Sequence, residues 1–316
     1  MSPGSADSNL EQRPHPNHPK ESDMYAVIGA TGNTGRVVAE DLLAAGQPVR
    51  VIGRAEDRLA PFVERGAEAA VGDVSDAEFV ARACDGVGGV YHLIPPRFDI
   101  DLREWQTTAG KALAAGIRDA GVPYVVNLSS VGAQHREGTG PIAGLREQED
   151  RFNELTETNV LHLRPGWFME NLYMMLDAIR GMDMLPMPIP GDLPVAMIAT
   201  KDIGAEAARR LMALDFDGHH IKELLGPRDY TLSEVAAIVG AAIGKPDLPF
   251  VTVPEEAAAA GFEQMGVHPA TVATFMEMYR GFGNGRIVAL EARSAANTTP
   301  TTLEEFAVGL AAAYGA

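Results

Sequence analysis

The sequence predicts an α/β protein in which a doubly wound parallel sheet carries a smaller C-terminal lobe. Three observations support this fold class. Short β-rich runs alternate with helix-length segments from residue 24 to residue 165, and such alternation is typical of a parallel sheet covered by helices. A glycine-rich turn joins the first strand to the first helix within residues 24–38. Beyond Pro165-Gly166 the alternation ends and helical stretches dominate.

Each predicted strand is a short apolar run that ends at a turn or at proline. The first strand begins at Met24 and leads into the glycine-rich turn, and Pro95-Pro96 ends the fourth strand. The later strands are expected at Gln47–Gly53, Ala69–Gly72, Gly89–Ile94, Tyr124–Ser129 and Val160–Leu163. The helices between them are expected at Asp57–Arg65, Asp76–Cys84, Asp101–Ala120 and Leu145–Thr156.

The residues after Pro165-Gly166 predict a smaller, discontinuous α+β lobe. Helical stretches are expected at Phe168–Arg180, Asp202–Leu214, Ser233–Ile243, Glu255–Met265, Thr271–Tyr279 and Leu303–Ala313. Extended pieces are expected at Val195–Ile198, His220–Leu225 and Phe250–Val253. We assign residues 24–165 to the sheet domain and residues 166–200 and 227–316 to the lobe, with 201–226 returning to the sheet. Such a lobe usually lies over the carboxyl ends of parallel strands, where ligands bind.

Composition and charge exclude several classes of protein. Acidic residues outnumber basic residues by 43 to 26, and the net charge of −17 argues against nucleic-acid binding. No apolar run approaches the roughly 18 residues of a membrane span, and the single cysteine, Cys84, excludes an internal disulfide. Residues 1–23 are polar and lack the apolar centre of a secretory signal, which predicts a disordered leader. We expect a cytoplasmic protein without nucleic-acid or membrane partners.

The glycine-rich turn is the most informative segment of the chain. Its three glycines, Gly29, Gly32 and Gly35, are each separated by two residues. Glycine permits a tight turn and a close approach to a pyrophosphate, while the helix N-terminus offers N–H groups and a positive dipole. The pattern predicts a dinucleotide site, and the alternative is a glycine-rich turn without a ligand. The contacts expected from this turn are Gly29, Thr31, Gly32, Asn33, Thr34 and Gly35.

Arg54 indicates which dinucleotide to expect. An acidic residue at the end of the second strand holds the ribose of NAD, and an arginine there accommodates the additional phosphate of NADP. Gly53-Arg54 therefore favours NADP(H), unless Arg54 is a solvated surface side chain. Asp73, after the third strand, is expected at the adenine edge or as a helix cap. Ile94 and Pro95, at the end of the fourth strand, are expected near the nicotinamide.

Several segments, taken in their order along the chain, resemble one known family. They are Gly29–Gly35, Arg54, Gly72-Asp73, Asn127–Gly132, Leu163–Asn171, Lys201–Ile203 and Gly226–Glu234. With these segments the chain is similar to the NmrA-like branch of the atypical short-chain dehydrogenases. The resemblance implies an NADP-binding Rossmann domain and a variable C-terminal substrate lobe. Members include NAD(P)H:quinone reductases, dye and azo reductases, iminium reductases, and redox-sensing regulators without turnover.

The Tyr-x-x-x-Lys pair of ordinary short-chain dehydrogenases is missing. In that pair, tyrosine protonates the carbonyl oxygen and lysine lowers the pKa of the tyrosine. No tyrosine of this sequence is followed by lysine at the fourth position, and the helix where related members keep a lysine or histidine reads Leu145–Glu149. Quinones, conjugated dyes and iminium ions can accept hydride first and take a proton from water later, so they need no strong acid.

Ser129, Ser130 and His135 are the candidates for catalysis in the sheet domain. Both serines end the fifth strand on the same edge as the glycine-rich turn. There they could reach the nicotinamide ribose or the substrate, or else cap the turn that follows. His135 lies on the next loop, as a proton source or as a solvated side chain. A tyrosine of the lobe is a further way to polarise an oxygen. The sequence contains no metal-ligand spacing.

Aromatic residues after the sixth strand are the candidates for the substrate site. Trp167, Phe168 and Tyr173 lie at the mouth of the expected cleft. Aromatic side chains and methionines form an adaptable surface for a flat apolar ligand, although helix packing explains the same composition.

The sequence therefore predicts an NADP-dependent oxidoreductase that transfers hydride to a small conjugated apolar acceptor. Quinones, azo and other dyes, and iminium ions are the expected acceptor types. The alternative is a catalytically weak NADP(H)-sensing protein that acts through a protein partner. The sequence is compatible with a homodimer but does not decide the oligomeric state.

Overall fold

A seven-stranded parallel sheet forms the centre of the larger domain in the computed structural model, which describes residues 24–315. The predicted leader, residues 1–23, and Ala316 lie outside the described residues. The strands are β1 (Tyr25–Ile28), β2 (Val49–Gly53), β3 (Glu68–Val71), β4 (Gly89–His92), β5 (Tyr124–Leu128), β6 (Asn159–Pro165) and β10 (His219–Leu224). Their order is β10-β6-β5-β4-β1-β2-β3, and every neighbouring pair is parallel. The predicted doubly wound α/β fold is therefore confirmed.

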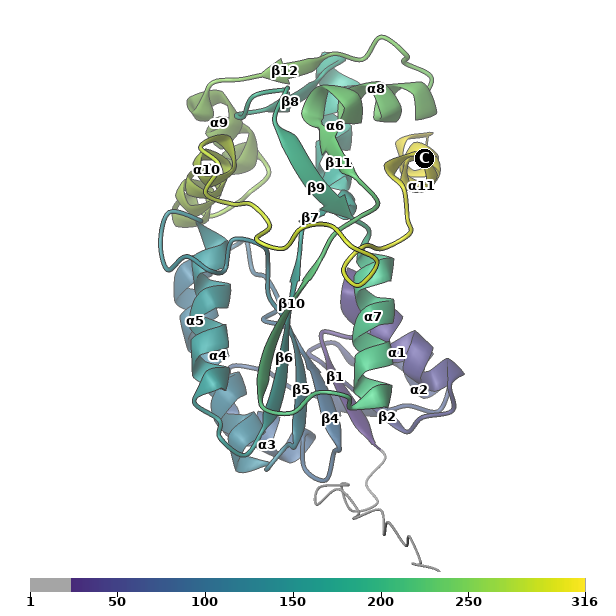
Figure 1. Ribbon diagram of the computed structural model, residues 1–316, viewed down its shortest axis with the longest axis vertical. Helices are drawn as coiled ribbons and strands as arrows, with labels where there is room; N and C mark the ends of the chain where they lie inside the picture. Colours follow the sequence, from purple (N-terminus) through teal and green to yellow (C-terminus); the bar gives the residue numbers. More distant parts are fainter. Residues whose placement is uncertain (1–23, 316) are drawn as a thin grey trace, which may run out of the picture.

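Helices cover both faces of this sheet (Figure 1). One face carries α3 (Ala77–Ala83), α4 (Leu102–Asp119) and α5 (Pro141–Asn153), and the other carries α1 (Asn33–Ala44), α2 (Glu56–Val63) and α7 (Thr200–Ala213). Buried residues of β1 alternate between the two cores, because side chains along a strand point to opposite faces. Ala26 and Ile28 pack in the core under α3, α4 and α5. Tyr25 and Val27 pack in the core under α1 and α7.

The helix expected at 145–156 is wrong at both ends, because α5 spans Pro141–Asn153. The chain turns at Gly140, whose φ of +58° is unfavourable for other residues. Pro141 then occupies the first helical turn, where its missing N–H leaves no bond unmade. A Cβ at position 140 would lie 2.2 Å from the Thr274 carbonyl oxygen, so glycine also lets this turn pass close to the C-terminal lobe.

The lobe lies at one end of the sheet and contains two small sheets and several helices (Figure 1). Its strands are β7 (Trp167–Phe168), β8 (Leu185–Met187), β9 (Pro194–Ile198), β11 (Asp229–Thr231) and β12 (Phe250–Thr252). Its helices are η1 (Met169–Met175), α6 (Leu176–Met182), α8 (Leu232–Ala242), α9 (Glu255–Gln264), α10 (Pro269–Gly283) and α11 (Leu303–Gly315). Within residues 201–226, α7 packs against α1 and β10 pairs with β6. Among the described residues, no helix is long and apolar enough to cross a membrane.

The stretch expected as one helix at Phe168–Arg180 is divided in the structure. Its first residue belongs to β7, in which Trp167 and Phe168 pair with Met197 and Ile198 of β9. The 3-10 helix η1 and then α6 follow. Strand pairing therefore overrides the helical pattern and keeps the two aromatic residues extended where the sheet domain meets the lobe.

A row of buried polar side chains crosses the centre of the sheet. His92, Asn127 and His162 occupy matching positions on β4, β5 and β6. The His92 Nδ1 and Asn127 Oδ1 atoms are 2.7 Å apart, and Asn127 Nδ2 and His162 Nδ1 are 2.9 Å apart. His162 Nε2 lies 3.2 Å from Asn153 Oδ1 on α5. We refer to these four side chains as the polar ladder.

The Asn127 amide assigns the protons along the polar ladder. Its oxygen accepts from His92 Nδ1–H, and its nitrogen donates to His162 Nδ1, so the His162 proton lies on Nε2. Both imidazoles are neutral, because burial lowers the pKa of His92 to about 3 and that of His162 to about 4. His92 Nε2 is buried without a hydrogen-bond partner among the described residues. The histidines therefore act as neutral hydrogen-bonding groups within the core.

The polar ladder predicts that the folded protein loses stability at acidic pH. Histidine in the unfolded chain binds a proton near pH 6.5, whereas folded His162 stays neutral down to about pH 4, so stability is lost as the pH falls through this window. This group alone accounts for a loss on the order of 3 kcal/mol. Urea unfolding of His162→Gln between pH 8 and 4.5 should show a shallower decline than the wild type. His135→Gln, on a loop outside the ladder, should keep the wild-type slope, and parallel curves for His162→Gln would contradict this assignment.

Candidate functional site

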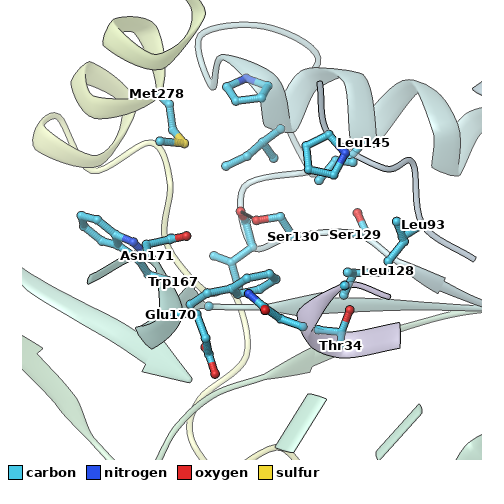
Figure 2. A pocket seen from close by; sticks show the side chains of 18 of the residues that line it. Thr34, Leu93, Leu128, Ser129, Ser130, Leu145, Trp167, Glu170, Asn171 and Met278 are labelled. Atoms are coloured by element: carbon cyan, nitrogen blue, oxygen red, sulfur yellow. Dashed lines mark hydrogen bonds between the residues drawn. The ribbon is translucent and has the colours of Figure 1, made fainter. Parts of the chain in front are cut away.

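A cavity of about 1690 Å³ opens between the carboxyl ends of the strands and the lobe. The sheet domain contributes the glycine-rich turn and the residues that follow β2, β4 and β5. The lobe contributes residues from β7 and η1 and from α9 and α10. Figure 2 shows Leu93, Leu128, Ser129 and Leu145 along one side of this pocket and Trp167, Glu170, Asn171 and Met278 along the other. The sheet domain and the lobe therefore enclose one continuous cavity.

The glycine-rich turn brings α1 against the end of β1. Gly29 has a φ of +72°, which glycine adopts without strain. A Cβ at position 35 would lie 2.3 Å from the Gly29 carbonyl oxygen, so only glycine allows this close approach of helix and strand. Gly29 and Gly32 line the cavity together with Thr31, Asn33 and Thr34. Gly35, also predicted as a cofactor contact, is buried and does not line the cavity, and its closeness to Gly29 supports a packing role.

The N-terminus of α1 has the features of an anion-binding site. No side chain caps this helix, and its first turn contains no acidic residue. The unpaired N–H groups and the positive end of the helix dipole therefore face the cavity without a competing negative charge. The buried Thr34 hydroxyl is fixed by the Tyr91 hydroxyl, which donates to it over 2.8 Å. These features fit the pyrophosphate of a dinucleotide.

Arginines stand beside the glycine-rich turn, where the second strand ends. Arg54 and Arg58 both line the cavity and are exposed. Arg58 Nη2 donates to the Thr31 carbonyl oxygen over 3.2 Å, which leaves the rest of its guanidinium for an anion. Arg54 has no hydrogen-bond partner or ion pair within the described part of the chain, and the additional phosphate of NADP would supply one.

Asp73 does not line the cavity, although the sequence predicts it at the adenine edge. Its Oδ1 accepts from the Ser75 N–H at 2.9 Å and from the Ser75 hydroxyl at 2.8 Å. The Ser75 N–H, the Ser75 hydroxyl and the nearby Arg54 lower the pKa of this carboxylate. Asp73 is not the helix cap either, because Asp76 caps α3. Its observed role is to close the turn between β3 and α3.

Ile94 and Pro95, which the sequence analysis expects near the nicotinamide, line the cavity at the end of β4. The Trp105 indole N–H donates to the Pro95 carbonyl oxygen over 2.7 Å. This bond fixes the loop after β4 to α4, so the cavity wall is rigid at this point.

A buried ion pair holds the ends of β5 and β6 at the base of the cavity. Arg164 Nε and Nη2 donate to the two Glu149 carboxylate oxygens over 2.8 and 2.5 Å. The Arg164 and Glu149 side chains are 4% and 1% exposed. The Ser129 hydroxyl donates to Glu149 Oε1 over 2.6 Å. Because its proton is held by this carboxylate, Ser129 can accept a hydrogen bond in the cavity but cannot readily donate one.

The other two candidate catalytic residues lie in different surroundings. Ser130 lines the cavity, and its hydroxyl donates to the Val131 carbonyl oxygen over 2.9 Å. His135 does not line the cavity, so the structure does not bring it together with the serines. Within residues 24–315, no group of three histidine, cysteine or acidic side chains could hold a metal ion.

The lobe supplies an aromatic chamber around the far half of the cavity. Trp167, Phe168 and Tyr173 line it, as the sequence predicts. The wall also contains Phe262 of α9 and Phe275, Met278 and Phe282 of α10, which the sequence analysis missed. Tyr279 of α10, one of the lobe tyrosines that could polarise an oxygen, lines it as well. The spacing of the α10 residues by three and four positions is the signal that one face of this helix is apolar, but it does not distinguish a core from a cavity wall.

The segment 287–293 closes another side of the cavity, which the sequence analysis also missed. Ile287, Val288, Ala289, Glu291, Ala292 and Arg293 line it. Glu223 of the edge strand β10 is 2% exposed, and its carboxylate accepts from the N–H groups of Leu290 and Glu291 over 2.8 to 3.0 Å. Arg293 bonds to Asp229 over 2.6 Å. Side chains of the sheet domain and of β11 therefore hold this segment in place.

Comparison with known proteins identifies the family. The family model described as the NmrA-like family matches residues 21–307. The chain belongs to the NmrA-like family. An NAD(P)H azoreductase from Xenophilus azovorans is 29% identical over 299 residues, which cover 93% of this chain and all of that protein. The sequence similarity therefore extends over most of both chains.

Solved structures show the same fold. The NADPH-dependent quinone oxidoreductase of Escherichia coli, complexed with NADPH, superposes with a TM-score of 0.77 at 22% identity. The Citrobacter sp. triphenylmethane reductase complexed with NADP(H) has a TM-score of 0.74 at 20% identity. Each comparison covers 91% of this chain and 99% of the other chain. At these identities the likeness establishes the architecture of sheet domain and lobe.

The buried ion pair leads to a stability prediction. Glu149→Gln should destabilise the protein by about 3–5 kcal/mol, because it leaves the Arg164 charge buried without its partner. The control Glu147→Gln weakens two partly exposed ion pairs, with Arg103 and Arg151, and should cost less than about 1 kcal/mol for each. Urea unfolding measures both effects.

A double variant separates charge burial from packing at this ion pair. Glu149→Met combined with Arg164→Met removes both charges, so it should recover at least half of the stability that Glu149→Gln loses. If the double variant is less stable than Glu149→Gln, the cost does not arise from an uncompensated charge.

Proposed function

We propose that this NmrA-like protein is an NADP-dependent oxidoreductase that transfers hydride from NADPH to a small, conjugated, apolar acceptor. The observation that carries the proposal is the continuity of the cavity, which joins an anion-binding glycine turn to an aromatic chamber. The azoreductase relative acts with NAD(P)H by its name. The solved relatives named above include a quinone oxidoreductase and a dye reductase.

The sheet domain has the groups that NADP(H) requires. The uncapped N-terminus of α1 fits the pyrophosphate because it offers backbone N–H groups, and Gly29 and Gly32 leave no side chain in the way. Arg54 and Arg58 fit the additional phosphate. Ile94 and Pro95, on the wall that Trp105 fixes, are our candidates for the nicotinamide side. When bound there, NADPH supplies the hydride.

The polar groups near the serines favour an acceptor that needs no strong acid. The Ser129 proton is held by Glu149, and no Tyr-x-x-x-Lys pair exists in the sequence. Glu170 lines the cavity, but both of its oxygens lie 3.0 Å from the Thr200 N–H, so it stabilises the start of α7. The protein therefore acts mainly by holding a planar acceptor in an apolar chamber beside the cofactor.

Quinone, azo-dye and iminium acceptors share the property that this chamber requires. Each is flat and conjugated, and each accepts hydride at an electron-poor atom before a proton is needed. The aromatic and methionine side chains from η1, α9 and α10 give such a ligand an apolar surface to stack on.

The assignment of Arg54 predicts cofactor discrimination. Arg54→Ala should weaken NADPH binding by about 10- to 100-fold, because a charge-assisted hydrogen bond to phosphate is lost. NADH lacks that phosphate, so its affinity should stay nearly unchanged. Arg118→Ala, at the far end of α4, is the matched control and should alter neither dissociation constant. Titration calorimetry measures these constants, and an equal loss for NADPH and NADH would overturn the phosphate assignment.

The reductase proposal is tested by turnover. The absorbance of the reduced nicotinamide should fall when purified protein and NADPH are mixed with at least one acceptor from a panel of quinones, azo dyes and cyclic iminium ions. Product analysis should show one reduced acceptor for each NADPH oxidised. Tight NADPH binding without reduction of any acceptor would contradict the proposal and would favour a cofactor-sensing protein instead.

A further inference from the structure

Tyr279 places a hydroxyl in the aromatic chamber without a hydrogen-bond partner. The residue lies on the buried face of α10, is 6% exposed and lines the cavity. No hydrogen bond is made by its hydroxyl within the described part of the chain. Buried tyrosines usually satisfy their hydroxyl group, because an unmade bond in an apolar environment costs free energy. The Tyr279 oxygen is not among the fully enclosed side-chain atoms without a partner in residues 24–315, so it is reachable from the cavity and free to bond a ligand.

Trp167 presents a second donor of the same kind. Its side chain is largely buried, lines the cavity and stacks on Phe282 at a centroid distance of 5.2 Å. Its indole N–H has no acceptor among residues 24–315, in contrast to the Trp105 N–H, which donates to Pro95. The rings of Trp167 and Tyr279 are 6.4 Å apart, so one flat ligand can contact both. The rings of Phe262 and Tyr279 are also stacked, with their centroids 6.4 Å apart.

We propose that the Tyr279 hydroxyl and the Trp167 indole N–H form a donor subsite that binds a carbonyl oxygen of a quinone acceptor. This inference rests on the proposed reductase function and deepens it. It assigns the recognition of the acceptor oxygen to the lobe rather than to the serines that end β5.

The chemistry of the two groups suits this task. Indole N–H is a donor only, and burial raises the pKa of Tyr279 to about 12, so the phenol keeps its proton at neutral pH. When a quinone receives hydride, negative charge develops on its oxygen atoms. Two donors in an apolar chamber stabilise that charge, and water supplies the proton that completes the hydroquinone. Tyr279 thus binds the oxygen and does not lose its own proton.

The binding test compares two ligands of nearly the same shape. Calorimetry with protein saturated with NADP⁺ would measure the affinity of 1,4-naphthoquinone, which has acceptor oxygens, and of naphthalene, which has none. Tyr279→Phe should weaken naphthoquinone binding about five- to tenfold and leave naphthalene binding unchanged. Tyr314→Phe, on α11 outside the cavity, is the matched control. Equal affinity of wild type and Tyr279→Phe for naphthoquinone, or an equal loss for both ligands, would overturn the subsite.

A kinetic readout separates this inference from the reductase proposal. Tyr279→Phe should lower kcat/KM for naphthoquinone by about tenfold or more. The substitution should leave kcat/KM for a cationic triarylmethane dye unchanged, because hydride neutralises the cation at its central carbon and leaves no charge on oxygen. Equal effects on both substrates would contradict the subsite. If the wild type reduces no acceptor at all, the reductase proposal fails, and the binding comparison still decides whether the donors recognise a carbonyl oxygen.

Discussion

The buried pair of Glu149 and Arg164 is the interaction on which the site depends most. It joins α5 to the end of β6 and, through Ser129, to the end of β5. Two charges removed from water are tolerated only because their hydrogen-bonding capacity is nearly filled by one another and by the serine. The geometry of the cavity base is therefore fixed by a set of bonds that has little freedom to rearrange.

This constraint decides which chemistry the sheet domain can offer. A serine whose proton is held by a carboxylate does not polarise a substrate oxygen by donation. The polar ladder lies within the core of the sheet domain. Its histidines, His92 and His162, are buried and neutral, so neither imidazole supplies a proton to the cavity. The sheet domain consequently provides a platform for the nucleotide, which is why our proposal assigns recognition of the acceptor oxygen to the lobe.

The sequence predicts features that depend on neighbouring residues better than features that depend on distant segments, for a physical reason. The glycine-rich turn lies within one strand–turn–helix unit, so its conformation follows from local glycines. Arg54 follows directly after β2. In contrast, Glu149 and Arg164 signal burial only as a pair from two elements, although an arginine within the apolar run of β6 is itself a sign that it needs a partner. Gly140 likewise requires glycine because α10 passes beside it, which no local pattern reveals.

The aromatic chamber is likewise built from segments that are distant in the sequence. Its walls come from β7, from α9 and α10, and from the segment 287–293, which Glu223 holds from the edge of the sheet. None of these segments forms part of the glycine-rich turn or the end of β2. Substitutions along α10 should therefore alter the lobe side of the cavity while the nucleotide platform keeps its geometry. Under our proposal, the lobe therefore contributes most to acceptor choice, whereas the groups that fit the cofactor come from the sheet domain.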